Sequence, residues 1–153
     1  AYVKAKPVIQ AFAELIEYVG ESGSGFAVKA INNTLMATHL WALAEGLTVL
    51  KSKGVDLSAA LSCINASSGK SNISENIMAQ RVLNRKFEKT FALDLLQKDI
   101  GIAVDLVEQA NLELSAMKLI QHEFNLIEKS EASQLDFSAA VQGLERKSSI
   151  QLN

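Results

Sequence analysis

The sequence contains very few of the residues that cross-link a chain or interrupt helices. Among its 153 residues, Cys63 is the only cysteine and Pro7 the only proline, and aromatic residues make up 6%. A lone cysteine excludes an intrachain disulfide and any metal site built from several cysteines, so we expect a cytoplasmic protein rather than an exported one. Cys63 stands between Ser62 and Ile64 in an apolar stretch, which predicts a buried, unreactive thiol.

The sequence also lacks an excess of charge of either sign and a long apolar run. Its 15 Lys and Arg residues face 17 Asp and Glu residues, giving a net charge of −2, which would not attract nucleic acid or anionic lipid. The most apolar stretch, residues 35–50, is interrupted by polar residues and does not reach the roughly 20 apolar residues that span a bilayer. We therefore expect neither nucleic acid nor a membrane as a partner.

Two further kinds of site find little support. His39 and His122 are far apart in the chain, and neither stands among cysteines or carboxylates at the spacing of metal ligands, so we expect no metal. Residues 69–71, Gly-Lys-Ser, are similar to the end of a phosphate-binding P-loop, but Ile64 stands where the first glycine of that loop is required. Without this glycine and a preceding strand, the P-loop is excluded.

What the sequence does contain favours one helical domain. Hydrophobic residues make up 48% and charged residues 21%, as in a compact globular domain. Apolar residues recur at helical spacing and strand signals are weak. We predict an all-α fold, a bundle of six or seven helices within a single domain at 1–153, with a frayed tail at 148–153. The expected helices lie at residues 7–19, 26–53, 57–64, 74–83, 91–110, 113–129 and 136–147.

The longest of these helices is the most clearly defined. Between Phe26 and Lys53 no residue is a stronger helix breaker than Gly46, which predicts one unusually long central helix. Gly54 is placed to end this helix, and Asp56 is placed to cap the next one. The long helix is too apolar to be surrounded by water on every side, so one face of it must be covered.

A glycine-rich segment, residues 20–25, precedes the long helix. A dinucleotide fingerprint needs a strand before it and a glycine where Val28 stands, so this segment is not that fingerprint. Its glycines allow the backbone to approach a ligand, and free N–H groups at a helix start favour anions. Lys29 and Asn33 follow, one turn apart on one helix face, and could bind one small molecule together. The alternative is a solvated lysine beside a surface asparagine.

A second polar pair lies inside the expected helix 91–110. Lys98 and Asp99 are surrounded there by apolar residues, which places them at the edge of a buried surface. The alternative is an ordinary exposed charge pair. The pair therefore becomes informative only in combination with the first segment.

Taken together, the two segments resemble one enzyme family. Residues 20–33 resemble the signature G-x-x-G-x-G-x-x-x-K-x-x-N-N of β-hydroxyacid dehydrogenases, and every fixed position is met. Residues 98–103, Lys-Asp-x-x-x-Ala, are similar to the K-D-x-x-x-A region of the same family, at the spacing that the family shows. Over nearly its whole length the chain thus resembles the helical C-terminal domain of the 3-hydroxyisobutyrate dehydrogenase type, which is related to 6-phosphogluconate dehydrogenase.

This resemblance implies an NAD(P)-dependent oxidoreductase that oxidises a small β-hydroxyacid or reduces the matching semialdehyde. NAD or NADP would be bound mainly by an N-terminal Rossmann domain, which is absent from this chain, so we expect the chain alone to be inactive. Lys29 would handle the proton of the hydroxyl group and Asn33 would orient the substrate. Lys98 and Phe91 would contact the cofactor. The other substrate contacts that the resemblance implies are Gly23, Ser24, Asn32, Ser68, Gly69 and Asp99.

The role implied for Lys29 makes a demand on its surroundings. An ordinary lysine side chain, with a pKa of about 10.4, is a poor base at neutral pH. A neighbouring positive charge would lower that pKa, and we expect Lys98 to supply it. The resemblance also implies a homodimer or homotetramer joined through the long helix. The alternative is a non-catalytic helical oligomerisation or scaffold module, in which Lys29 and Lys98 are surface charges on separate faces.

Overall fold

The computed structural model describes residues 2–153, except for the side chains of Lys129 and Ser130. Within these residues the fold is helical, and a single bridge between Ala92 and Asp136 replaces any strand. The predicted all-α bundle around one long helix is confirmed. The helices are α1 (Tyr2–Ile9), α2 (Ser24–Ser52), α3 (Leu57–Asn65), η1 (Ile73–Leu83), α4 (Leu93–Gln109), α5 (Ser115–Asn125), α6 (Lys129–Ala132), η2 (Phe137–Ala140) and α7 (Val141–Ser148).

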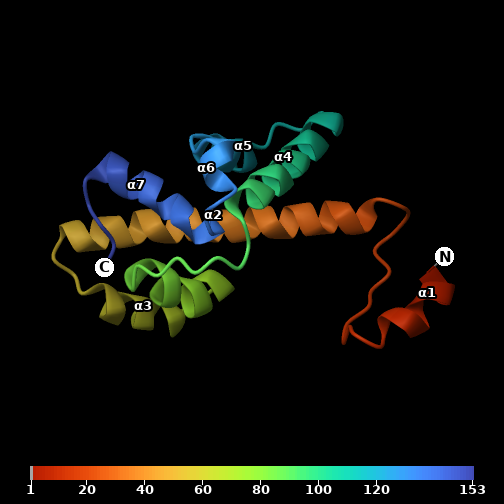
Figure 1. The fold of residues 1–153 in the computed structure, drawn as a ribbon, viewed down its shortest axis with the longest axis horizontal. Helices are drawn as coiled ribbons and strands as arrows, with labels where there is room; N and C mark the ends of the chain where they lie inside the picture. Colours follow the sequence, from red (N-terminus) through yellow and green to blue (C-terminus); the bar gives the residue numbers. More distant parts are fainter. Residues whose placement is uncertain (1) are drawn as a thin grey trace.

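The helix α2 is the axis of the molecule (Figure 1). Helices α4 and α5 lie on one side of it and α3 and η1 on the other, with α7 alongside its C-terminal half. Its small and aliphatic residues recur every three or four positions on the covered face, and the buried ones are Ala30, Ala37, Leu40, Ala44 and Leu47. The aromatic ring of Trp41 packs against Phe124 of α5, with the ring centres 5.9 Å apart.

The end of α2 follows the local sequence signals. Gly54 adopts a left-handed conformation, with φ of 75°, which ends the helix without the steric strain that a side chain would bring. Asp56 then accepts a hydrogen bond from the backbone N–H of Ala59 at 2.7 Å and caps α3. Both predictions are confirmed. In contrast, the prediction of a buried Cys63 is wrong, because its side of α3 is exposed.

The predicted first helix, residues 7–19, is wrong. The helix α1 ends at Ile9, and residues 13–19 have no regular secondary structure and stand apart from the bundle (Figure 1). The apolar side chains of this segment remain open to solvent, with Phe12 77% exposed. A short helix is marginal unless its apolar face is packed, and this face has no partner in the bundle. Tyr2 holds this segment instead, through its ring against Tyr18 and its hydroxyl on the carbonyl of Ile16.

The segment η1 is helical where the sequence predicts a helix, but it is wound as a π-helix. Ile73 and Val82 are both buried although they are nine residues apart. Nine residues make about two and a half turns of an α-helix, which would put these two side chains on opposite faces. The wider π winding brings them to the same face. The buried spacing therefore explains the winding, which the sequence pattern alone does not reveal.

The predicted helix 113–129 is interrupted. It is α5 up to Asn125 and resumes at α6. Gln97 of α4 is buried, and its Nε2 donates hydrogen bonds to the carbonyl oxygens of Phe124 and Ile127 at 2.7 and 2.9 Å. These bonds satisfy carbonyl groups at the end of α5. The buried amide therefore fixes the point at which α5 ends.

The prediction of a frayed tail at residues 148–153 is also wrong. Leu152 is fully buried, and its backbone N–H donates to Glu145 at 2.8 Å. Arg85 binds the same carboxylate through both of its terminal nitrogens and also donates to the carbonyl of Leu152 at 3.2 Å. A buried apolar anchor combined with an ion pair thus keeps the tail on the bundle.

Candidate functional site

The carboxylate of Asp99 joins two residues of α2 to α4. Its Oδ2 accepts hydrogen bonds from Lys29 Nζ at 2.5 Å and from Asn33 Nδ2 at 2.6 Å. Lys29 and Asn33 share one face of α2 because they stand one turn apart, and the packing of α2 on α4 brings Asp99 to that face. Residues that are 70 positions apart in the chain therefore form one polar cluster, which we call the Lys29 cluster.

The Lys29 cluster is buried on one side and open on the other. Asp99 is only 3% exposed because it lies three residues after Leu96 and four before Ala103, two core residues of α4. The side chain of Lys29 is 55% exposed. The ammonium group is thus held from below by a buried carboxylate while its other side faces solvent. A small molecule approaching from solvent would meet Lys29 first.

Burial alone would raise the pKa of Asp99, because a low-dielectric surrounding disfavours the charged form. The hydrogen bonds from Lys29 and Asn33 oppose this effect, and the positive charges of Lys29 and Lys98 add to them. The net result is a pKa below the ordinary value. Asp99 is therefore ionised at neutral pH and forms a charge pair with Lys29.

Asn33 and Asn32 extend the cluster along α2. Asn33 donates to Asp99, which leaves its Oδ1 free to accept from Asn32 Nδ2 at 3.4 Å. Gly23 precedes the helix with φ of 99°, and no side chain caps the first N–H groups of α2. Ser24 begins the helix. The backbone N–H of Ser24 donates to Glu21 and that of Ala27 to Gly23. This leaves the N–H groups of Gly25 and Phe26 at the start of α2, about one turn from Lys29, an arrangement that favours a carboxylate.

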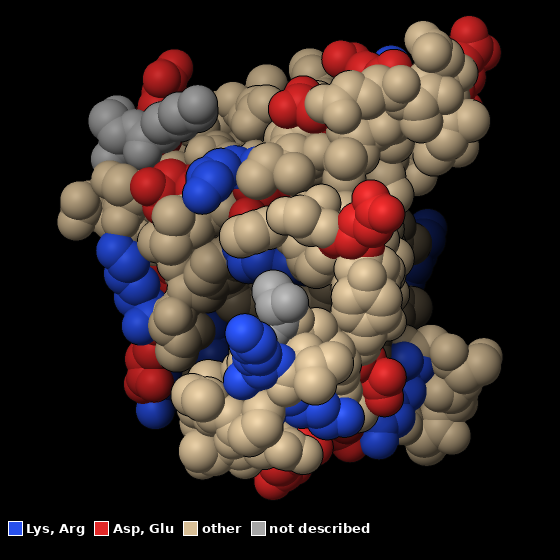
Figure 2. Space-filling view, turned by 90° about the vertical axis from the view of Figure 1, so that its right-hand side faces the viewer, with Lys and Arg blue, Asp and Glu red and all other residues tan. Residues whose placement is uncertain are grey.

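The charges at this end of the molecule are mixed. Figure 2 looks onto the end at which α2 begins, where acidic and basic side chains are interspersed and several Lys and Arg side chains surround a hollow near the centre. Lys29 of α2 and Lys98 of α4 place two positive charges around Asp99, although the chain as a whole carries a net charge of −2.

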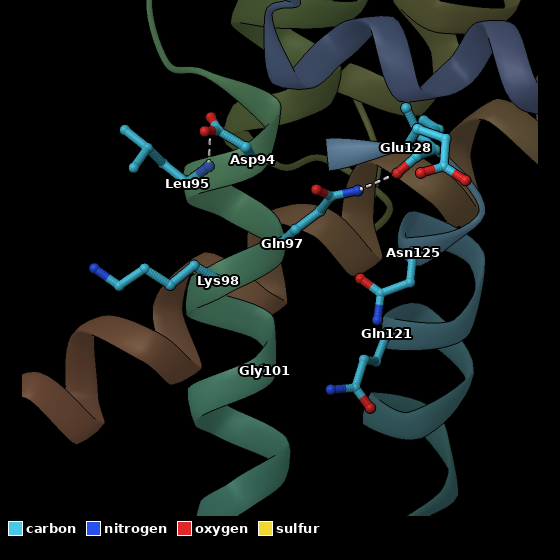
Figure 3. Close-up of a pocket in the computed structure, with 9 residues that line it drawn as sticks. Asp94, Leu95, Gln97, Lys98, Gly101, Gln121, Asn125 and Glu128 are labelled. Carbon is cyan, nitrogen blue, oxygen red and sulfur yellow. Dashed lines mark hydrogen bonds between the residues drawn. The ribbon is translucent and has the colours of Figure 1, made fainter. Parts of the chain in front are cut away.

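The structure places Lys98 and Phe91 near this region but not in the cluster. Lys98 is exposed, and it contributes its positive charge to the surroundings of Asp99. Lys98 lines the edge of a groove between α4 and α5, and Figure 3 shows its side chain leaving α4 on the side away from α5. Phe91 is half-buried just before α4, with its ring 6.3 Å from that of Phe137. The charged residue that contacts Lys29 is thus Asp99. The sequence indicated Lys98 as the charged neighbour of Lys29 and did not reveal the contact with Asp99.

Ser68 and Gly69 lie in the exposed loop between α3 and η1. Among the described residues, no hydrogen bond joins either of them to the Lys29 cluster. The following residues of the loop, Lys70 and Ser71, line a hollow of about 310 Å³ together with Asn32. The loop therefore approaches the cluster from the side of Asn32. The loop residues nearest to it are Lys70 and Ser71 rather than Ser68 and Gly69, the two that the resemblance indicates.

A second buried aspartate escaped the sequence analysis, which treated Asp136 only as the start of a helix. Its side chain is 1% exposed and accepts from Arg81 at 3.2 Å, from the backbone N–H of Thr90 at 2.9 Å and from the Ser138 hydroxyl at 2.6 Å. Burial raises the pKa of Asp136, but the hydrogen bonds from Ser138, Thr90 and Phe91 outweigh it, so the pKa is lowered. Asp136 thereby fixes the backbone that carries Phe91 into α4.

The described residues contain neither a metal-binding cluster nor a membrane-spanning helix. No group of three His, Cys, Asp or Glu side chains there is arranged to hold a metal ion. Within residues 2–153, no helix combines the length and the apolarity needed to cross a membrane.

The sequence of the chain is similar to those of known dehydrogenases and reductases. Residues 23–144 match the family model described as NAD-binding of NADP-dependent 3-hydroxyisobutyrate dehydrogenase. The chain is 33% identical over 113 residues to 2-(hydroxymethyl)glutarate dehydrogenase of Eubacterium barkeri, covering 74% of this chain and 38% of that protein. It is 29% identical over 144 residues to 2-hydroxy-3-oxopropionate reductase of Escherichia coli, covering 94% of this chain and 49% of that protein.

The fold also matches a solved structure. The 3-hydroxyisobutyrate dehydrogenase of Mycobacterium tuberculosis, determined with L-serine, superposes with a TM-score of 0.82 at 24% identity, covering 93% of this chain and 50% of that chain. At this identity the likeness concerns the fold alone. The chain spans half or less of the length of these three proteins.

Proposed function

The chain belongs to the family described as NAD-binding of NADP-dependent 3-hydroxyisobutyrate dehydrogenase, and on that premise we propose that it is the helical part of an NAD(P)-dependent dehydrogenase for a small β-hydroxyacid. The full-length protein would oxidise a substrate like 3-hydroxyisobutyrate or reduce the matching semialdehyde. The observation that carries this proposal is the Lys29 cluster, in which Lys29, Asn33 and Asp99 meet at 2.5 and 2.6 Å beside the open start of α2.

The cluster suits proton transfer to and from a substrate oxygen. Asp99 is ionised and buried, so water does not compete with the ammonium group of Lys29 for its carboxylate, and the carboxylate orients that group. An ammonium held in this way can donate a proton to the carbonyl oxygen of a semialdehyde. Its exposed side allows a proton to be replaced from solvent. The backbone N–H groups of Gly25 and Phe26, with the side chains of Ser24 and Asn32, would hold the carboxylate of the acid.

The residues present fit a nicotinamide dinucleotide in charge and position. Lys98 is an exposed cation, and among the described residues it forms no ion pair or hydrogen bond, so it is available to a phosphate group. Phe91 offers a half-buried ring two residues before α4 begins and seven residues before Lys98. When bound, the nicotinamide supplies the two-electron acceptor or donor for the carbon that bears the hydroxyl group. We assign Lys98 and Phe91 to holding the cofactor.

We also propose that α2 joins two copies of the protein. Val28, Leu35 and Val49 lie at intervals of seven residues or twice seven, which places them on one stripe of the helix, and all three are exposed. A homodimer or homotetramer would cover this stripe. Sedimentation of the protein and of its Leu35→Lys variant tests the assignment, because a charge on the stripe should convert the oligomer to monomers.

The function is tested by enzyme assay of the full-length protein. Reduction of NAD and of NADP is measured with a panel of small β-hydroxyacids, for the native protein and for Lys29→Ala at equal folded concentration. Loss of the proton-transferring group should lower kcat/KM by about 10²–10⁴-fold. The matched control is Lys118→Ala, which removes a lysine of similar exposure, 52%, from α5. Turnover of none of the acids, or an undiminished Lys29→Ala, would favour the non-catalytic scaffold module.

A further inference from the structure

A groove with a volume of about 840 Å³ lies between α4 and α5 (Figure 3). Gln97, Lys98 and Gly101 line it from α4, and Gln121 and Asn125 line it from α5. Asp99 leaves α4 in a different direction, toward α2. The groove is therefore on a separate face of α4 from the Lys29 cluster, and Lys98 stands between the two.

Carboxamide groups from both helices meet in this groove. Figure 3 shows Gln97 pointing from α4 toward α5, and Gln121 and Asn125 pointing from α5 toward α4. Gly101 has no side chain to fill the space between them, and a methyl group there would still be 3.9 Å from Gln121 Nε2. The missing side chain keeps the centre of the groove open.

Several polar groups of the groove lack partners among the described residues. Among the described residues, the side chains of Gln121, Asn125 and Lys98 form no hydrogen bond or ion pair. Gln97 is 4% exposed, and its Oε1 is buried without a donor although its Nε2 is fully used. Buried polar atoms are nearly always paired. A hydroxyl group at the bottom of the groove would supply the missing donor after a small adjustment of the neighbouring side chains.

The chemistry of the lining selects among ligand classes. Each free carboxamide offers a donor and an acceptor side by side, which matches the paired donor and acceptor of neighbouring hydroxyl groups. Asp94 and Glu128 also line the groove and outnumber Lys98, so an anion is disfavoured. Leu95 and Ile127 add only a limited apolar surface. The volume lies in the range of sites for small organic ligands.

We propose that the groove between α4 and α5 is a second binding site, for a small saccharide or polyol that presents neighbouring hydroxyl groups to Gln97, Gln121 and Asn125. This site is independent of the proposed dehydrogenase activity. The two sites share one residue, Lys98, which lines the edge of the groove and whose charge also acts on Asp99.

The test observes the carboxamides directly. Two-dimensional ¹H–¹⁵N spectra of the chain are recorded while D-ribose, D-glucose and maltose are added, and the side-chain signals of Gln121 and Asn125 are assigned by their loss in the alanine variants. Binding should shift these two signals in a saturable way. Gln121→Ala and Asn125→Ala should each weaken the affinity by about tenfold, the loss expected for hydrogen bonds to a neutral ligand. Gln109→Ala, which removes an exposed amide at the C-terminal end of α4 and outside the groove, should bind like the native chain.

A second pair of variants separates binding from folding. Gly101→Ala fits without a clash and should preserve binding, whereas Gly101→Leu should abolish it while the dispersed backbone spectrum is kept. Absence of saturable shifts with all three sugars would overturn the proposal. It would also be overturned if NAD shifted the same signals and the sugars did not, because the groove would then belong to the cofactor.

Discussion

Asp99 and Asp136 are both buried carboxylates with lowered pKa values, yet their surroundings differ in one respect. All partners of Asp136 are fixed by the fold: Arg81, with only 18% of its side chain exposed, and groups of Thr90 and Ser138. The main partner of Asp99 is Lys29, whose ammonium group reaches solvent. A buried carboxylate with immobile partners holds the fold together, whereas one with a solvent-facing partner can orient that partner, as the proposed function requires of Asp99 and Lys29.

The largest expected loss of stability follows from removing Asp136, the carboxylate whose partners are all fixed by the fold. Asp136→Ala leaves the Arg81 charge without its partner and leaves the backbone N–H groups of Thr90 and Ser138 without an acceptor. We expect the free energy of unfolding to fall by about 3–5 kcal/mol. Urea unfolding of the chain, followed by circular dichroism, measures it. Glu108→Ala, in the exposed pair with Lys118, should change stability by less than about 0.5 kcal/mol. If Asp136→Ala lost no more stability than the Glu108→Ala control, Asp136 would not hold the fold together and the contrast with Asp99 would be wrong.

The next largest effect is expected from removing the solvent-facing partner of Asp99. Lys29→Met leaves a buried carboxylate with Asn33 as its remaining hydrogen-bond donor. We expect a loss of about 1–3 kcal/mol, because an incompletely paired buried charge is left behind. The double variant with Asp99→Asn removes that charge and should recover part of the loss in the same urea experiment. If the double variant is no more stable than the single one, the two groups are not coupled.

A smaller effect is expected from the opposite deletion. In Asp99→Asn the lysine loses its partner but can turn into water, since 55% of its side chain is already exposed. The amide keeps the shape of the carboxylate, and its oxygen can still accept the hydrogen bond from Asn33. We therefore expect a loss of about 1 kcal/mol or less. A loss matching that of Asp136→Ala would show that Asp99 is structural in the same sense.

The smallest effect concerns acid. Both aspartates have a lower pKa in the folded chain than the ordinary value of about 3.9 in the unfolded chain. Between the two pKa values the unfolded chain binds more protons, so stability rises with pH there. The stabilisation is complete above about pH 4 and is lost as the pH falls through the folded pKa. Asp99→Asn should flatten the pH dependence of the urea midpoint below about pH 4 and leave it unchanged above. An unaltered acid limb would contradict the lowered pKa.

Features governed by neighbouring residues in the sequence could be predicted. The stop at Gly54 and the cap at Asp56 depend on local backbone geometry, and both were found as expected. The shared face of Lys29 and Asn33 follows from helical periodicity alone. The family resemblance rests on the same local patterns and is confirmed by the match over residues 23–144.

Features governed by distant contacts could not be predicted in this way. The sequence expectation gave Lys98 as the neighbour of Lys29, because only the packing of α2 on α4 reveals Asp99 as its partner. The end of α5 depends on Gln97, a residue of another helix. The wrong helix at 7–19 has the same origin, since its apolar pattern is genuine but nothing in the bundle covers it. One signal was available: the position of Asp99 between core residues of α4 already indicated a buried carboxylate.

The separation of 70 residues between Lys29 and Asp99 also indicates when the pair forms during folding. The chain must close a long loop before the two side chains can meet, and such contacts form late compared with the turns of a single helix. A refolding chain should therefore recover its helical signal before the lysine gains its carboxylate. A partly folded chain is then helical before Lys29 has the carboxylate that orients it, so under the proposed function the site is assembled only when folding is complete.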